Sequence, residues 1–259
     1  MTRPLRLATW NIHKGIGPDR RYDLARTMAV LQALDADVVC LQEVDENVSR
    51  SRHHSQTRII ARELRYEHHA VGLNVSVGSG HYGNATLSRH PIVHARNFDL
   101  TIPPKKRRSG LVTRVLDGNG EPLTVVNVHL GLLHLERRIQ VRSLLAHLFA
   151  NAAPAEGLVI AGDWNDWGNR LHASLAAPHG FHLARLPDHR RAGLKTYPSR
   201  RPLAALDKIL YREPVRLHHV ACVLEDRARE ASDHLPLVAE LHLTRAAHAP
   251  AGRDRLATA

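Results

Sequence analysis

The pattern of apolar and polar positions begins as an alternation of strands and helices. Short apolar runs predict strands at 5–9 and 38–41, and apolar residues at helical spacing predict helices at 22–34 and 59–64. The order strand, helix, strand, helix is typical of an α/β protein.

The middle of the chain has a different pattern, in which short alternating runs are separated by turn residues. The segment 117–120, Asp-Gly-Asn-Gly, is a hairpin signal, and consecutive hairpins predict antiparallel sheet. The strands predicted in this part are 67–71, 83–88, 92–100, 111–116 and 123–128.

The last part returns to helices and buried strands. Residues 132–150 have helical spacing, and the continuous apolar run 158–161 predicts a strand that is buried on both faces. The apolar positions of that helix are Leu135, Ile139, Leu144, Leu145 and Leu148. Further along the chain we expect a short helix near 171–176 and strands at 206–211, 216–224 and 236–243.

This mixture predicts an α/β sandwich of two packed sheets with helices outside, in which each sheet buries one face on its partner and the other under helices. The chain has 259 residues, 43% of them hydrophobic, so it can bury a substantial core. We expect a single domain over residues 1–245, because no Gly/Ser linker or charge block divides the chain. Residues 246–259 lack apolar periodicity and are expected to form a loose tail.

The composition adds a strong positive charge. Lys and Arg number 36 against 25 Asp and Glu, which gives a formal net charge of +11. This excess favours an anionic partner such as nucleic acid, a phosphorylated small molecule or a lipid headgroup. An Arg-rich protein without a polyanionic partner is an equally good interpretation, because the charge is spread along the chain. Aromatic residues make up only 4% of the chain, which disfavours single-stranded nucleic acid bound by base stacking.

The two cysteines and the absence of long apolar runs argue against a disulfide-rich protein, a cysteine-ligated zinc protein and a membrane-spanning protein. Cys40 and Cys222 lie in apolar runs and are predicted to be small buried hydrophobes, not zinc ligands or a disulfide framework. The N-terminus lacks the apolar stretch of a secretory signal, and no run is long enough to span a bilayer. We therefore expect a cytoplasmic protein with no transmembrane segment, and the sequence implies no obligate protein partner.

Polar side chains follow five of the apolar runs and interrupt a sixth. They are Asn11, Glu43, Asn127 with His129, Asp163 with Asn165, Asp233 with His234, and Asp207, which lies inside the apolar run 206–210. Acids seldom lie in apolar runs without a partner. Asp163 and Asn165 point to the same side if the strand continues through them, and the alternative is a turn. Gathered at one rim, these groups would bind a hard cation or a phosphate.

Seven short motifs, in this order and spanning residues 9–236, resemble the endonuclease/exonuclease/phosphatase superfamily of metal-dependent phosphoesterases. They are Thr9-Trp10-Asn11, Leu41-Gln42-Glu43-Val44, Gly83-Asn84-Ala85-Thr86-Leu87-Ser88-Arg89, Asn127-Val128-His129-Leu130, Gly162-Asp163-Trp164-Asn165, Leu206-Asp207-Lys208-Ile209 and Ser232-Asp233-His234-Leu235-Pro236. No single motif is specific, but the ordered set is. The resemblance implies a four-layer α/β/β/α sandwich like that of DNase I, with two mixed, mostly antiparallel sheets and helices outside. It is strongest for a small bacterial branch of the family.

The resemblance also implies a metal site. Glu43 would bind Mg²⁺ or Mn²⁺ with the amide of Asn11 nearby, and Asp233 would be a second metal ligand or a group of the metal's shell. Few protein ligands and several waters suit Mg²⁺.

Phosphodiester cleavage further needs an activated water, neutralised phosphoryl oxygens and a protonated leaving group. By resemblance, Asp163 and Asn165 would position the water and a phosphate oxygen, with Asp163 as the candidate base. His234 would contact the phosphate or share the base role, with its tautomer fixed by Asp207. His129 stands where nuclease-like and sphingomyelinase-like members have a proposed general acid and where abasic-site enzymes tend to have tyrosine, which argues against a dedicated abasic-site enzyme.

Four further residues are predicted to bind substrate. His13 and Lys14 are the best candidates, whereas Asn84 and Asn127 either contact substrate or only hydrogen-bond loops around the pocket. The basic run 105–108 either grips phosphates beside the site or is a solvated loop tip, and we favour the solvated tip.

One motif of the chain is misleading. Residues 78–83 match the dinucleotide fingerprint GxGxxG, but that motif needs a helix directly after it, and 84–88 have the pattern of a strand. We expect a flexible loop at the pocket mouth there instead of nucleotide binding.

The sequence thus predicts a metal-dependent phosphoesterase that hydrolyses a phosphodiester, in nucleic acid or a phospholipid-like substrate, by attack of an activated water. The alternatives are a phosphomonoesterase acting on a small phosphorylated molecule and a non-catalytic binding protein that retains the fold.

Overall fold

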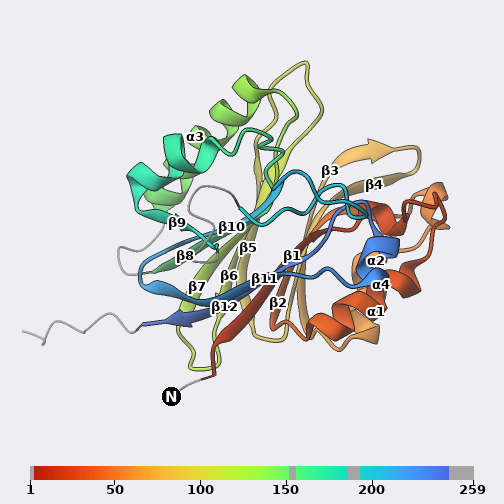
Figure 1. The fold of residues 1–259 in the computed structure, drawn as a ribbon, viewed down its shortest axis with the longest axis horizontal. Helices are drawn as coiled ribbons and strands as arrows, with labels where there is room; N and C mark the ends of the chain where they lie inside the picture. The colour runs from red at the N-terminus through yellow and green to blue at the C-terminus, as the bar shows by residue number, and fades with distance from the viewer. Residues whose placement is uncertain (1–2, 152–155, 186–192, 245–259) are drawn as a thin grey trace, which may run out of the picture.

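The strands form two six-stranded sheets in a computed structural model that describes residues 3–151, 156–185 and 193–244 (Figure 1). The first sheet, in spatial order, contains β11 (Val215–Cys222), β12 (Leu237–Leu243), β1 (Leu5–Asn11), β2 (Val38–Glu46), β4 (Gly80–Ser88) and β3 (His68–Val77). The second contains β5 (Ile92–Asp99), β6 (Ser109–Leu116), β7 (Pro122–His129), β8 (Gly157–Asp163), β10 (Asp207–Arg212) and β9 (Phe181–Leu183).

Each sheet has one parallel pair at its centre. β1 pairs with β2 in parallel, β7 pairs with β8 in parallel, and the other pairs are antiparallel. The prediction of mixed, mostly antiparallel sheets is therefore confirmed. Parallel neighbours run toward the same end of a sheet, so Asn11 at the end of β1 lies near Glu43 in β2, and the last residues of β7 and β8 lie side by side.

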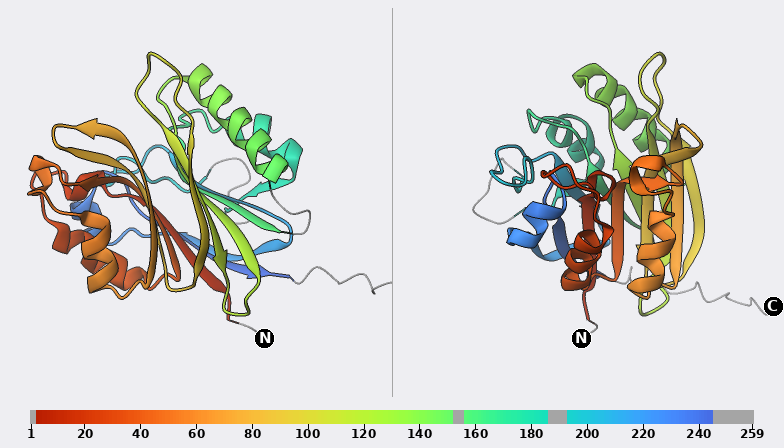
Figure 2. Two further views of the ribbon diagram at one scale, coloured as in Figure 1. Left: turned by 180° about the vertical axis from the view of Figure 1, so that it is seen from behind. Right: turned by 90° about the vertical axis from the view of Figure 1, so that its right-hand side faces the viewer.

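Helices cover the outer faces of both sheets, which gives four layers (Figure 2). The first sheet is covered by α1 (Leu24–Leu34), α2 (Gln56–Glu63) and α4 (Asp226–Ala231), and the second by α3 (His134–Asn151) with the short segments η3 (His172–Ala176) and η4 (Ala177–His179). Two short 3₁₀ turns, η1 (His13–Gly15) and η2 (Ser49–Ser51), follow β1 and β2.

Alternation along the strands explains the layers. On β1, Trp10 packs under the helices and Leu7 faces the second sheet, while on β8 Ile160 packs against α3 and Val159 faces the first sheet. Successive strand residues point to opposite faces, so each central strand supplies two apolar interfaces. Cys40 lies between the sheets and is buried, as predicted, whereas Cys222 is only partly buried.

Helix α3 departs from the prediction in its orientation. Its buried apolar residues are Val141, Leu144, Leu145 and Leu148. Leu135 and Ile139, which have the same helical spacing, lie on the opposite side and are exposed. Apolar residues therefore line two faces of this helix, and the sheet buries only one of them.

The other predicted elements begin and end within a few residues of those in the structure, except that β2 and β3 continue five and six residues beyond their predicted ends. The three-residue strand β9 and the short helix α4 were not predicted. Residues 80–83 are paired in β4, so the loop expected over 78–83 is the tight turn of the β3–β4 hairpin. The tail expected at 246–259 lies outside the described residues.

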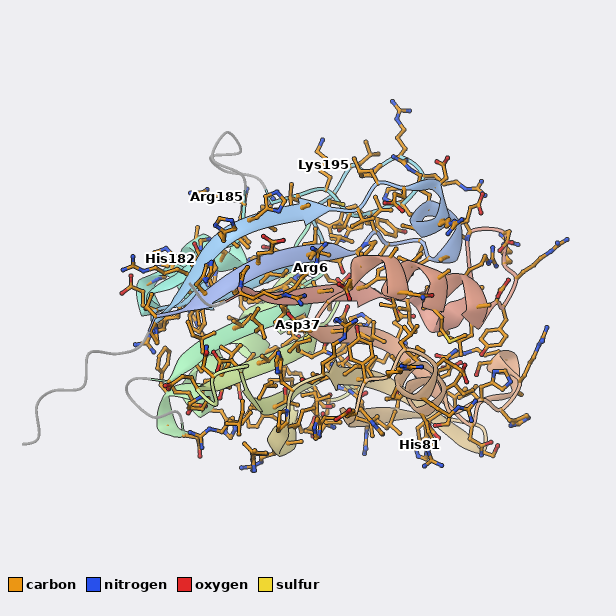
Figure 3. The ribbon with its side chains drawn as sticks, turned by 90° about the horizontal axis from the view of Figure 1, so that it is seen from below. Arg6, Asp37, His81, His182, Arg185 and Lys195 are labelled. Carbon is orange, nitrogen blue, oxygen red and sulfur yellow. The ribbon has the colours of Figure 1, made fainter. Side chains whose placement is uncertain are left out.

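At the end of the first sheet where β2 begins, two hydrogen bonds between Arg6 and Asp37 join β1 to β2. The Asp37 carboxylate accepts a hydrogen bond of 2.8 Å from the backbone N–H of Arg6, and the Asp37 N–H donates to the Arg6 carbonyl (Figure 3). This reciprocal pair holds β1 and β2 in register where β2 begins. No helix in the described part of the chain is long and apolar enough to cross a membrane.

Candidate active site

Three predicted site residues lie side by side on adjacent strands of the second sheet. The register pairs His129 of β7 with Asp163 of β8, and Asp163 with Asp207 of β10. All three side chains are buried. Strand pairing alone therefore places an imidazole and two carboxylates in one row.

The strand β8 approaches β7 too closely for a side chain at Gly162. Gly162 has a φ of 146°, and a Cβ there would overlap the carbonyl oxygen of Val128. A conformation with positive φ and no room for a Cβ is available only to glycine. This glycine fixes the level at which Asp163 leaves the sheet.

The chain turns immediately after Asp163. The Asp163 Oδ1 accepts a hydrogen bond of 2.9 Å from the Asn165 N–H, and Asn165 has a left-handed φ of 49°. The strand therefore does not continue through Asp163 and Asn165, so the interpretation in which both side chains point to one side is wrong. The local structure is the turn that was its alternative. Asn165 instead donates through Nδ2 to the Leu130 carbonyl, 3.0 Å away, which holds it next to the segment after β7.

His234 is brought in from the far end of the sequence by two contacts with β1. Trp10 Nε1 donates to the His234 carbonyl (2.9 Å), and Ser232 Oγ donates to the Asn11 carbonyl (2.7 Å). The His234 ring then lies between two acids, with Nδ1 at 2.8 Å from Asp207 Oδ2 and Nε2 at 3.8 Å from Asp163 Oδ2.

The two histidines have opposite electrostatic environments. Burial acts to lower the pKa of His234, but the charges of Asp207 and Asp163 outweigh it and raise the pKa to about 10. Burial, assisted by the charge of Arg108, lowers the pKa of His129 to about 4. At neutral pH His234 is therefore an imidazolium and His129 is neutral.

The first sheet presents Glu43 through a bulge in β2. Leu41 pairs with Ala85 and Val44 with Gly83, so β2 has one more residue than β4 in this interval, and Glu43 has a left-handed φ of 55°. Bulges of this kind redirect a side chain out of the regular alternation. The strand predicted to end at Leu41 therefore continues past Glu43.

Glu43 is ionised and paired. Burial acts to raise its pKa, but the positive charges of His129, which is protonated in the acid range where Glu43 titrates, and of Lys14 outweigh it and lower the pKa to about 2. The Lys14 ammonium donates directly to the Glu43 carboxylate. Lys14 itself has a left-handed φ of 65° within η1, a conformation that is strained for a side-chain-bearing residue and tends to occur at functional sites.

Asn11 joins the two halves of the site. Its Nδ2 donates to Asp163 Oδ2 (3.1 Å), and its Oδ1 accepts from the His13 N–H (3.0 Å). Asp233 lies at the margin, partly exposed, with Oδ1 at 3.9 Å from His13 Nδ1. Asn11, His13 and Asp233 are therefore neighbours on the first-sheet side.

The two remaining predicted residues lie between the sheets. Asn127 is fully buried, donates to the carbonyls of Leu41 and Ala85, and accepts from Gln42 Nε2. Asn84 is buried and donates to the carbonyls of Ser109 and Asn127. Their amides tie one sheet to the other, so of the two interpretations the structure favours the structural one, and the substrate contact expected of Asn127 is not available to its amide.

Sequence reasoning missed Arg108 as a site residue because it ends a run that was predicted to be solvated. The run is divided: Lys105, Lys106 and Arg107 are exposed, whereas Arg108 is buried and its charge acts on His129. Among the described residues its guanidinium has no hydrogen bond or ion pair with protein, and its Nε is buried without a partner. The sequence signal was only its position directly before β6.

A buried pair beneath the site was also missed. The Lys208 ammonium lies 3.9 Å from Asp166 Oδ2, both side chains are buried, and burial lowers the pKa of Lys208 to about 8 against the attraction of Asp166. Asp166 in turn accepts from the Leu171 N–H (3.0 Å), which anchors the segment after the Asp163 turn.

Two groups of residues can be considered for a metal ion. Asp163, Asp207 and His234 place ligand atoms within 4.8 Å of one another, but His234 is held as an imidazolium, and a histidine ligand must be neutral. Glu43 offers an ionised carboxylate already beside a cationic group, and Asn11 offers an amide oxygen on the adjacent strand. These oxygen donors suit a hard divalent cation, so the first-sheet residues fit a metal better.

Comparison with known proteins finds relatives over nearly the whole chain. The model of the Endonuclease/Exonuclease/phosphatase family matches residues 8–234. The chain is 32% identical over 250 residues to the uncharacterized protein YbhP of Escherichia coli K12, covering 92% of this chain and 96% of YbhP.

Solved structures share the fold. An endonuclease/exonuclease/phosphatase from Beutenbergia cavernae superposes with a TM-score of 0.79 at 27% identity, covering 93% of this chain and 72% of that one. TDP2 of D. rerio, solved with a single-strand DNA product, superposes with a TM-score of 0.71 at 20% identity, covering 92% and 98% of the two chains.

Proposed function

The chain belongs to the endonuclease/exonuclease/phosphatase family, and we propose that it hydrolyses a phosphodiester by attack of a water activated at Asp163, with a divalent cation, Mg²⁺ or Mn²⁺, held by Glu43 and Asn11. The family consists in general of hydrolytic phosphoesterases. The proposal adds the type of ester, the metal and the residue roles.

The observation that carries the proposal is the convergence on Asp163. Its carboxylate lies 3.1 Å from Asn11 Nδ2, 3.6 Å from His129 Nε2 and 3.8 Å from His234 Nε2. A buried carboxylate surrounded by these donors is oriented to accept a proton from water. A protein that only bound phosphate would have no use for an oriented base beside two histidines.

Each side chain then has a distinct task. The Asp163 carboxylate orients the water and takes its proton, while the His234 imidazolium, fixed through Nδ1 by Asp207, donates from Nε2 to a phosphoryl oxygen. Asn165 lies next to Asp163 and borders the space for the water and the phosphate. The Arg108 guanidinium supplies a second positive charge for the phosphate. When bound at Glu43, a divalent cation supplies further charge neutralisation at phosphorus and makes the water more acidic.

The role that we propose for His129 differs from the general-acid role that the family resemblance implied. With a pKa of about 4 it carries no proton to release in the free protein at neutral pH. We propose that His129 donates a hydrogen bond from its neutral ring to the leaving oxygen, and that it gains basicity only when an anionic substrate lies against it.

The test is hydrolysis of bis-p-nitrophenyl phosphate with added Mg²⁺ or Mn²⁺. We expect metal-dependent turnover that falls about 10³-fold in Asp163→Ala, within the range for loss of a general base. The matched control is Asp99→Ala, which removes an acid from the edge strand β5. Turnover that survives Asp163→Ala would contradict the proposal, and faster release from p-nitrophenyl phosphate would favour a phosphomonoesterase.

A further inference from the structure

Apolar side chains are exposed where the chain leaves β7 and enters α3. Leu132 and Leu135 are each 69% exposed, Leu133 is 52% exposed, and Ile139 is 45% exposed. Leu135 and Ile139 are one helical turn apart, so they form a continuous stripe with the two residues that precede the helix. Nothing in the described residues covers this stripe.

A second exposed apolar group lies after β8. Trp167 is 61% exposed and its ring lies at 5.7 Å from that of Tyr197, which in turn lies at 4.9 Å from the His234 ring. Leu203 is 62% exposed, and its N–H donates to the Tyr197 carbonyl (2.8 Å). This group is therefore two ring contacts from a site histidine.

Both groups flank Asn165. On one side its amide donates to Leu130, two residues before the exposed stripe, and on the other its carbonyl accepts from the Trp167 N–H (3.2 Å). We call these six side chains the apolar rim, and they are Leu132, Leu133, Leu135, Ile139, Trp167 and Leu203. Because the rim adjoins the proposed site on two sides, whatever covers the rim also faces the site.

The segments that carry the rim, together with the neighbouring loop 100–108, are basic. Across 100–108, 130–142, 164–172 and 195–206, all within the described residues, the acids are Glu136 and Asp166, and both are buried. The exposed or partly exposed cations there are Lys105, Lys106, Arg107, Arg138, Arg142, Arg170, Lys195, Arg200 and Arg201. Figures 1 and 2 show the loop 100–108 beside the start of α3, and Gln140 joins them by donating to the Leu100 carbonyl.

We propose that the apolar rim docks on an anionic phospholipid surface and thereby presents the active site to lipid headgroups. Exposed leucines and a tryptophan beside Arg and Lys are the combination that inserts at the headgroup boundary while the cations attract anionic lipid. Nucleic acid would match the cations but would leave the five exposed aliphatic side chains of the rim without a function. The docking surface stands independently, whereas a headgroup phosphodiester as the substrate rests on the proposed function.

The test measures vesicle binding by the full chain carrying Asp163→Asn, so that no lipid is consumed. Vesicles of phosphatidylcholine are compared with vesicles that also contain phosphatidylglycerol. We expect binding to the anionic vesicles that weakens with added salt. Leu132→Ser combined with Leu133→Ser should reduce the bound fraction about fivefold or more, since each buried methylene contributes to interfacial affinity.

The matched control is Val93→Ser, which removes a side chain of similar exposure (55%) from β5. It should leave vesicle binding unchanged. The proposal is overturned if the parent binds no vesicles, or if the double variant binds them as well as the parent. It is also overturned if sedimentation velocity shows that the parent is a dimer and the double variant a monomer, because a second copy would then cover the rim. The same holds if the double variant no longer binds duplex DNA but still binds vesicles.

Activity separates this proposal from the proposed function. Without Asp163→Asn, the double Leu variant should hydrolyse bis-p-nitrophenyl phosphate at the parental rate and a vesicle-embedded phosphodiester about fivefold or more slowly. Loss of both activities would mean that the rim is part of the site itself and would overturn docking. If the parent binds vesicles but hydrolyses no diester, the proposed function fails and the docking surface remains.

Discussion

The two sheets contribute to the site in different ways. The second sheet supplies His129, Asp163 and Asp207 from adjacent strands in register, and all three are buried. The first sheet supplies Glu43 from a bulge and Lys14 from a strained turn, and both are partly exposed. One half is positioned by regular strand pairing, the other by departures from it.

This difference follows from what each half is proposed to do. Proton transfer depends on fixed distances among donors and acceptors, which strand register provides without further cost. The proposed cation would have to enter and leave, and the Lys14 ammonium would have to move aside for it at Glu43. The comparison therefore predicts that the first-sheet half tunes metal affinity and the second-sheet half tunes proton chemistry, and the following substitutions separate the two.

Glu43→Gln should have the largest effect. Removing the charged oxygen donor should weaken Mn²⁺ binding and lower diester turnover about 10³-fold, the upper range for losing one preorganised charge-stabilising group. Titration calorimetry with Mn²⁺ measures the binding, and excess metal should restore part of the turnover.

Glu46→Gln is the control, because Glu46 lies in the same strand and bonds to Ser55 instead of facing the site. If Asp207→Asn weakens Mn²⁺ binding more than Glu43→Gln does, the cation lies among Asp163, Asp207 and His234, and the division between the two halves is wrong.

Asp207→Asn should lower turnover about 10²-fold, because it removes the negative charge that holds His234 as an imidazolium and leaves only a neutral amide oxygen as the hydrogen-bond acceptor. The pKa of His234, followed by NMR in the presence of a chelator, should fall from about 10 toward its ordinary value. Asp99→Asn, on the edge strand β5, should leave that pKa unchanged.

The same pair predicts a pH dependence of stability. Since folding raises the pKa of His234 from 6.5 to about 10, its contribution to the free energy of unfolding is complete below pH 6.5 and disappears as the pH rises toward 10. Denaturant unfolding without metal should therefore show wild type and Asp207→Asn converging over this interval. A difference that stays constant with pH would contradict the charged pair.

Arg108→Gln should have the smallest effect, about a tenfold loss in kcat/KM carried mainly by KM, as expected for one charged hydrogen bond to the substrate. Because the Arg108 charge lowers the pKa of His129, that pKa should also rise in the variant. Arg107→Gln is the adjacent, exposed control and should change neither quantity. An equal loss in both variants would show that Arg108 acts only through the overall positive charge.

Local sequence signals were sufficient for most of the strands and helices and for many members of the candidate site. Apolar runs and hairpin residues predicted the strands because burial patterns are local, and the polar residues at strand ends identified Glu43, Asp163 and His234 before any geometry was known. The order of the seven motifs then predicted the family to which the chain belongs. These signals involve residues close together in the chain, and each can be recognised without its partner.

Other features depended on contacts between distant segments. From the sequence, Asn127 was a candidate for substrate contact, but its amide joins the two sheets. Arg108 was predicted to be the end of a solvated run, but it is buried and its charge acts on His129. Leu135 and Ile139 have core spacing, yet the sheet buries the opposite face of α3.

The sequence by itself determined the strands, the order of the motifs and the identity of the ionisable groups, because these follow from local burial and residue chemistry. The tertiary structure decided which of those groups share a pocket and what charge each histidine carries. The physical reason is that strand register and sheet packing bring together residues as distant as Asn11 and Asp163, and a pKa depends on those neighbours and on burial, which the linear order does not contain.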